Sequence, residues 1–341
     1  MNGGALPRRK AAAVSHTPAK AWHALCGSPA AIATASSFGI AELLTGSTRP
    51  QMLITSPVLF VLLVALYSCG VLTAWTLTQR WHGGWATLVL LGAAYGVLEE
   101  GLVARSFFDP HWADLGAMAA DGRWLGVNWI WTVYLMIFHA IFTVTIPVAL
   151  ARITVPGRAG GPWLSRRGQR CAAAGLAVLA VLGMLVVNPS AGSPILLFGA
   201  AVVMLVLGLL AWWAAAPRWR IAAFGCTKRS RQGLALLGLA GSALLFILGW
   251  ILPSLGMPAV IIIAGLIAAA AAASVTARHI ARRPLDLRRQ IALIAGVLAW
   301  LALVDLALAP ERPDTAALVI LASTVIVWRS RKARRQTVTT Q

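Results

Sequence analysis

Long apolar runs, separated by short polar segments, repeat along most of the chain. The runs carry few charges and are bounded by proline, glycine and clusters of Lys or Arg. About 20 helical residues cross the hydrocarbon core of a bilayer, and open backbone is too costly there. The pattern therefore predicts an all-α, polytopic bundle of about ten transmembrane helices. We expect them at 28–46, 57–76, 85–105, 127–149, 171–188, 194–216, 233–252, 258–277, 290–309 and 314–328.

The basic residues favour one orientation of this bundle. With both termini cytoplasmic, 25 of the 29 Lys and Arg residues fall in cytoplasmic segments, as the positive-inside rule predicts. The four that remain outside are Arg49, Arg105, Arg123 and Arg312. This distribution explains the net charge of +19 without a nucleic-acid partner. The expected partners are the lipid bilayer and, at the basic cytoplasmic loops, anionic lipid headgroups.

The cysteines give no sign of a cofactor. Four scattered cysteines form no CxxC pair and have no neighbouring histidine at ligand spacing. They therefore predict neither a zinc site nor a redox pair, and no cofactor is identified.

The pattern of apolar runs and basic loops divides the chain into segments of different character. The expected parts are a cytoplasmic disordered tail (1–27), a four-span module with intramembrane glutamates (28–150), a basic cytoplasmic loop (151–170), a six-span scaffold of three hairpins (171–328) and a basic cytoplasmic tail (329–341).

Two adjacent glutamates, Glu99 and Glu100, lie inside the third expected span, in the stretch GAAYGVLEEGL. A charged residue at the centre of a membrane helix costs about 2.5–3.5 kcal/mol, so such residues usually face a cavity or a partner. Glu100 continues a stripe with Gly92 and Gly96, which predicts that it faces a closely packed helix. Tyr95 lies one turn before Glu99, and its hydroxyl could donate to that carboxylate.

Other ionisable residues of the first four spans extend this candidate site. Glu42 is expected at a depth similar to that of the two glutamates, and His139 at a deeper level. Arg105 is badly spaced to pair with either glutamate, so it marks the outer interface or reaches another helix. In the outer loop, His111 and Asp109 could add metal ligands above the glutamates, whereas the alternative is a polar, water-facing loop. The identity of a bound metal is unknown.

The doubled glutamate followed by Arg105, and then His139 on a later span, resembles the CPBP intramembrane proteases, the CAAX-processing and bacteriocin-immunity group. The resemblance implies an intramembrane hydrolase in which Glu99 or Glu100 activates water and His139 takes the place of the first catalytic histidine. The family pattern is EExxxR, whereas this chain reads EEGLVAR. The segments AELLTGST, GAAYGVLEEGL and GVNWIW are also similar to a bacterial group of multi-spanning proteins without an assigned activity. This similarity implies a bacterial plasma membrane.

Three functions remain open on the sequence. The favoured one is an outward-opening, carboxylate-lined site that binds or transports a proton, a small cation or a cationic solute. The second is a structural or assembly role, and the third is an intramembrane hydrolase with a glutamate as general base, in which Glu99, Glu100 and His139 are the catalytic residues. The residues expected to bind ligand or proton are Glu42, Tyr95, Glu99, Glu100, Arg105 and His111.

Overall fold

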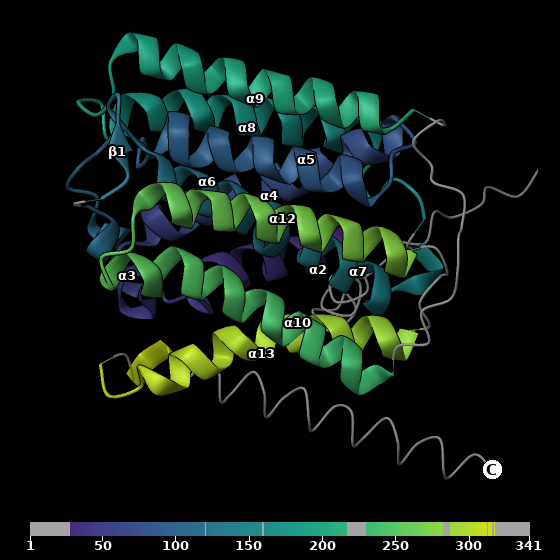
Figure 1. The fold of residues 1–341 in the computed structure, drawn as a ribbon. Coiled ribbons are helices and arrows are strands. Elements are labelled where there is room, and N and C mark those ends of the chain that lie inside the picture. Colours follow the sequence, from purple (N-terminus) through teal and green to yellow (C-terminus); the bar gives the residue numbers. More distant parts are fainter. Residues whose placement is uncertain are drawn as a thin grey trace, which may run out of the picture.

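The chain folds into a bundle of helices with one small β-hairpin (Figure 1). The structure is a computed structural model that describes residues 28–311 except 120, 159, 217–229 and 282–286, together with residues 313–315 and 317. The hairpin pairs β1 (Arg123–Trp124) with β2 (Val127–Asn128) in antiparallel register. The architecture confirms the predicted all-α class.

Four of the described helices contain or end in π-helical segments. The α-helices are α2 (Pro29–Phe38), α3 (Pro50–Thr55), α4 (Pro57–Arg80), α5 (Trp85–Gly96), α6 (Trp129–Phe138), α7 (Ile146–Thr154), α8 (Arg166–Val186), α9 (Pro194–Ala214), α10 (Arg231–Phe246), α11 (Leu252–Ser254), α12 (Ala259–Ala281) and α13 (Leu287–Ala307). The π-helical segments are η1 (Gly39–Leu43), η2 (Val97–Val103), η4 (His139–Thr145) and η7 (Ile247–Ile251), and short 3₁₀ turns are η3 (Ala113–Ala119) and η5 (Pro156–Arg158).

Proline and serine mark where many of these helices begin. Proline occupies the first turn of α2, α3, α4 and α9, where its missing N–H has no helical partner to lose. Ser165 and Ser230 cap α8 and α10 by accepting hydrogen bonds from the backbone N–H groups of Gly168 and Gly233. The helix starts thus follow local sequence chemistry, while the apolar runs decide how far each helix extends.

Eight helices of the described chain are long and apolar enough to cross a membrane. They are Pro57–Arg80, Trp85–Val103, Trp129–Thr154, Arg166–Val186, Pro194–Ala214, Arg231–Ser254, Ala259–Ala277 and Leu287–Ala307. The first expected span, 28–46, corresponds to the ten residues of α2 followed by the five of η1, so it is shorter than the others. Most of the last expected span, 314–328, and both expected tails, 1–27 and 329–341, lie outside the described residues.

The helices that carry the glutamates and His139 lie at the centre of the bundle. Within their apolar stretches, 61% of the residues of Trp85–Val103 and of Trp129–Thr154 are buried, against 33% or less in the other six. Helix α2 packs against α4 and α7, while α8 and α9 pack against α4 and α5 respectively and both touch η2. On the other side, α12 packs against α6, and α10 pairs with α13 (Figure 1).

Successive loops alternate between the two ends of the bundle (Figure 1). The β-hairpin and α3 lie at one end, on the left of the picture, whereas α12 ends and α10 begins near the other end. This arrangement groups the segments that the charge pattern assigns to the outer side at the hairpin end. The orientation of this bundle in the membrane remains a prediction from the basic residues.

Candidate functional site

Three π-helical segments carry the ionisable residues of the candidate site. Glu42 lies in η1, Glu99 and Glu100 lie in η2, and His139 opens η4. The wider turn of η2 is seen in the backbone bond from the N–H of Ala104 to the carbonyl of Glu99, 2.7 Å long. Because π-helical turns are rare and concentrate at functional sites, their coincidence with these four residues singles out this part of the bundle.

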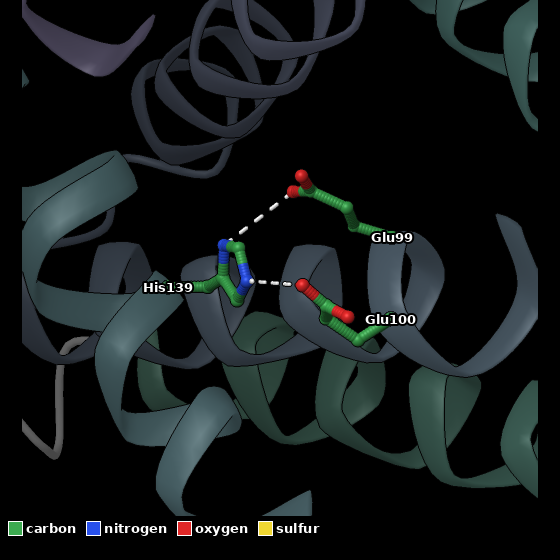
Figure 2. Close-up of side chains that lie close together, drawn as sticks. All are labelled: Glu99, Glu100 and His139. Atoms are coloured by element: carbon green, nitrogen blue, oxygen red, sulfur yellow. Dashed lines mark hydrogen bonds and ion pairs between the residues drawn. The ribbon is translucent and has the colours of Figure 1, made fainter. Parts of the chain in front are cut away.

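His139 is held between the two glutamates. Its Nδ1 atom lies 3.4 Å from Glu99 Oε2, and its Nε2 atom lies 3.3 Å from Glu100 Oε1. Figure 2 shows both carboxylates pointing toward the imidazole ring. The side chains of His139 and Glu99 are only 2% and 7% exposed, and that of Glu100 is 14% exposed. The side chains thus meet at one place, although the rise along the helices predicts a deeper level for His139.

Two glycines make this close contact possible. A Cβ atom on Gly96 would lie 2.9 Å from the Cβ atom of His139, and one on Gly92 would lie 2.8 Å from the Cα atom of Ala140. These distances are shorter than a normal van der Waals separation, so α5 and η4 approach as closely as they do only because both positions lack a side chain. This is the packing that the stripe of Gly92, Gly96 and Glu100 predicts.

Glu42 forms a second polar group beside the first. Its Oε1 atom accepts a hydrogen bond of 2.5 Å from the Tyr67 hydroxyl, and its other oxygen accepts one from the Thr48 hydroxyl. Glu42 is also close enough to interact electrostatically with Glu100 and His139, while Tyr67 interacts with Glu99. The two groups therefore form one polar cluster, as the similar depth expected for Glu42 and the glutamates suggests.

Hydroxyl side chains that the sequence pattern did not single out orient the charged groups. The Thr143 hydroxyl lies 3.0 Å from His139 Nδ1, and the Ser106 hydroxyl donates to Glu100 Oε2. Ser106 in turn accepts a hydrogen bond of 3.0 Å from the indole N–H of Trp131. Thr143 follows His139 by four residues and so shares its helix face, which is a signal that the sequence does contain.

Ser37 links the first helix to the histidine segment. Its fully buried hydroxyl donates a hydrogen bond of 2.7 Å to the backbone carbonyl of Thr143. Tyr95, which was expected to donate to Glu99, lies next to the cluster with its ring 6.0 Å from that of His139. Its hydroxyl is close enough to interact with the Glu99 carboxylate.

Arg105 reaches another helix, which is one of its two expected roles. The guanidinium donates to the backbone carbonyls of Met184 and Pro189, both at 2.7 Å, and of Ala191 at 3.2 Å. These carbonyls belong to the end of α8 and the turn that follows it. Arg105 adopts a left-handed backbone conformation, with φ of 57°, immediately after the glutamate segment. It therefore fixes the end of that segment to α8 and forms no ion pair with the glutamates.

The loop after η2 combines exposed polar residues such as His111 with apolar side chains that pack into the bundle. Four of its apolar side chains are buried: Phe107, Phe108, Leu115 and Met118. Arg123 ties the hairpin to the loop by donating to the carbonyls of Phe108 and Asp109, and burial lowers the pKa of its guanidinium, opposed by the charge of Asp109. This packing buries the end of η2 beneath the loop.

His111 and Asp109 do not join the glutamates. His111 is exposed, and its backbone N–H donates to Asp109 Oδ1 at 2.8 Å, while Asp109 Oδ2 accepts a hydrogen bond from Asn188. Within the described residues, the grouping able to hold a metal ion consists of Glu99, Glu100 and His139, with one donor atom of each within 4.8 Å of the others. Among the described residues, the three donor atoms that could meet at one ion thus lie inside the bundle.

The cluster combines three chemical abilities. Carboxylates and imidazole bind protons, they coordinate metal ions, and a glutamate beside a histidine can act as a general base. The carboxylates of Glu42 and Glu99 belong to residues that are 6% and 5% exposed. The sequence predicts a site that opens outward, whereas the described structure has these groups buried.

A family model described as an uncharacterized membrane protein family matches residues 32–339. The match covers most of the chain, which therefore belongs to this family and is a membrane protein. No curated protein and no solved structure matches the chain. The comparisons give no support to the resemblance to CPBP proteases.

Proposed function

We propose that the protein binds a cation, in the simplest case a proton, at Glu99, Glu100 and His139, and that it uses this site for transport. The observation that carries the proposal is the position of the imidazole, with one nitrogen 3.4 Å from Glu99 and the other 3.3 Å from Glu100. A proton or cation held there interacts with both carboxylates at once. This proposal keeps the function that the sequence favours but relocates the site from an open outer position to the buried interior.

The charge balance of the cluster supports cation binding. In the described part of the chain, the only ion pairs of the two glutamates are with His139, and Arg105 directs its guanidinium to backbone carbonyls instead. A centrally placed charge in a membrane helix costs about 2.5–3.5 kcal/mol. Two ionised carboxylates with a single histidine leave negative charge uncompensated. Binding of a proton or another cation removes this charge.

A row of hydrogen-bonding groups connects the cluster with the chain segment after η1. Thr48, which is half-buried, donates to Glu42, and Glu42 accepts from Tyr67. Tyr67 also interacts with Glu99, which contacts His139. Carboxylate, hydroxyl and imidazole groups in such a row are typical of proton relays in membrane transporters. The row provides the path by which a proton reaches the buried site.

Proton flux through the purified protein tests the proposal. Full-length protein is reconstituted into liposomes that contain a pH-sensitive dye, and a pH gradient is applied across the membrane. We expect flux above that of empty liposomes, and we expect Glu100→Gln to abolish it. Glu311→Gln is the matched control, because Glu311 is exposed and lies outside the cluster.

Two results would contradict the transport function. Equal flux through the wild type and Glu100→Gln refutes the transport function. If Glu100→Gln changes only thermal stability or assembly, the polar groups serve helix packing and the structural role is the correct one. Detection of folded Glu100→Gln protein by size-exclusion chromatography separates these results from simple misfolding.

A hydrolase is the second candidate, and one contact favours it. His139 Nε2 lies 3.3 Å from Glu100, and its other ring nitrogen lies 3.0 Å from the Thr143 hydroxyl. A glutamate oriented by a histidine in this way can activate water as a general base. Comparison of membrane proteins from cells with wild-type protein or Glu100→Ala tests it. An uncut membrane protein that accumulates only with Glu100→Ala supports the hydrolase, and unchanged membrane proteins refute it.

A further inference from the structure

We infer that the ion held by Glu99, Glu100 and His139 is a divalent transition-metal ion such as Zn²⁺, Mn²⁺ or Fe²⁺. The inference rests on the proposed cation-binding function and names the class of its ligand. Its starting point is the grouping of three donor atoms within 4.8 Å of one another. Each donor comes from a buried or half-buried residue in a π-helical segment.

The spacing of the donors is close to that of a metal site. Bonds from zinc to nitrogen and oxygen are about 2.0–2.2 Å long, so two ligands of a tetrahedral ion lie about 3.3 Å apart. His139 Nε2 and Glu100 Oε1 already have this separation, at 3.3 Å. Glu99 completes a set of three by a rotation of its side chain, because its donor atom lies within 4.8 Å of the other two. Three protein ligands leave a fourth position for water or another ligand, as in catalytic zinc sites.

The groups around the donors leave the required atoms free. With its proton on Nδ1, His139 donates to the Thr143 hydroxyl, 3.0 Å away, and turns the lone pair of Nε2 toward Glu100. The Ser106 hydroxyl donates a hydrogen bond to Glu100 Oε2, so Glu100 Oε1 remains available to bind a metal ion. Metal-binding histidines and carboxylates are oriented in this way by second hydrogen bonds.

Glu99 keeps one buried oxygen atom that a bound ion would satisfy. Its buried Oε2 atom lies 3.4 Å from His139 Nδ1 and meets no other hydrogen-bond geometry within the described residues, while the carboxyl group also interacts with the hydroxyls of Tyr67 and Tyr95. Buried polar atoms are nearly always satisfied, so an unsatisfied lone pair in the interior of a membrane protein calls for a ligand. The Glu99 carboxylate points into the cluster, where that ligand would lie (Figure 2).

The donor set selects the class of ion. Two carboxylates and a neutral imidazole carry two negative charges, which a divalent ion neutralises. Calcium and magnesium prefer oxygen ligands, whereas imidazole suits zinc, iron and the other transition metals. A nitrogen donor at the centre of the site therefore favours a transition-metal ion over the alkaline-earth ions.

Cobalt binding to the purified full-length protein tests the inference. The protein is treated with a chelator in detergent and titrated with Co²⁺, whose visible absorption reports a nitrogen- and oxygen-ligated site, and Zn²⁺ is then added as a competitor. We expect one Co²⁺ per chain that Zn²⁺ displaces. His139→Gln should weaken binding at least about 100-fold. His111→Gln is the matched control and should leave binding unchanged, because His111 is an exposed histidine outside the cluster.

A more conservative substitution, Thr143→Val, tests the metal site with less risk of misfolding. Thr143→Val keeps all three ligands and nearly the same side-chain volume, but removes the hydroxyl beside His139 Nδ1. We expect it to weaken Co²⁺ binding about 10–100-fold. Binding that is equal in the wild type, Thr143→Val and His139→Gln refutes the metal site, as does the absence of stoichiometric Co²⁺ in the wild type.

The metal site and the transport function fail in different ways. Proton flux that depends on Glu100, in a wild-type protein that binds no Co²⁺, overturns the metal site and leaves the proposed function intact. Stoichiometric Co²⁺ binding that depends on His139, without any flux of protons or Co²⁺ in liposomes, supports the metal site and overturns transport. Binding together with Glu100-dependent flux supports both.

Discussion

Replacement of Gly96 by alanine is expected to separate the glutamates from His139. The new Cβ atom would lie 2.9 Å from His139 Cβ and 3.3 Å from its Cγ and Cδ2 atoms, whereas carbon atoms in contact prefer about 3.5–4.0 Å. The helices must therefore move apart by several tenths of an ångström. Overpacking of this kind costs about 1–3 kcal/mol, and the removal of a flexible glycine returns about 0.4–1 kcal/mol. We expect a net destabilisation of about 1–2 kcal/mol.

Thermal unfolding of the purified variants in detergent measures this effect, and α9 offers the control. Gly199 on α9 has open space around it, with no atom within 4 Å of the position that an alanine Cβ would occupy, so Gly199→Ala should be neutral or slightly stabilising. Gly96→Ala should lower the apparent Tm by a few degrees and weaken Co²⁺ binding, while Gly199→Ala does neither. A Gly96→Ala variant with wild-type stability and wild-type Co²⁺ affinity would show that the close approach of α5 and η4 does not hold the site together.

Three further substitutions probe the contacts around the cluster. Arg105→Ala removes three charge-assisted hydrogen bonds to the end of α8 and the turn after it, and it should destabilise the protein by about 3–5 kcal/mol. The same thermal unfolding assay measures this loss, and a loss below about 1 kcal/mol contradicts the anchoring role of Arg105. Tyr67→Phe removes the hydroxyl that donates to Glu42 and should slow proton flux at least about tenfold in the liposome assay. Unchanged flux would show that Tyr67 does not carry the proton. Ser37→Ala leaves the Thr143 carbonyl without this donor and should cost about 1 kcal/mol in thermal stability, with no change expected if a water replaces the hydroxyl.

The apolar runs and their boundaries were sufficient to predict most of the helices. Pro57 and Trp85 begin helices where the sequence predicts spans, because proline and the apolar run act locally and need no tertiary context. Residues 28–46 were predicted as one full span, whereas α2 and η1 end at Leu43 and the chain then turns. The sequence does contain a helix-end signal in Gly46, which has a φ of 68°, but that signal does not show that the helix ends three residues earlier, at Leu43.

The contact between His139 and the glutamates could be anticipated only in part. The stripe of Gly92 and Gly96 predicts a close helix neighbour, but it does not identify which one. The depth comparison treated each span as a regular helix and did not predict that the side chains of His139 and both glutamates meet. The loop after η2 buries Phe107 and Leu115 within the bundle, so the end of η2 does not mark the surface. Such long-range packing has no signature in the local sequence.

The π-helical segments give the clearest reason to regard this cluster as more than a packing device. A π-helical turn is rare because it costs helix stability, and a residue pattern that served packing alone would be better satisfied by regular α-helix. In the described chain, η4 interrupts a long helix at His139, whereas η1 and η2 end their helices at Glu42 and at Glu99 and Glu100. The fourth π-helical segment, η7, lies outside the cluster. The coincidence of three π-helical segments with one set of acidic and imidazole groups therefore supports the proposed ion-binding site.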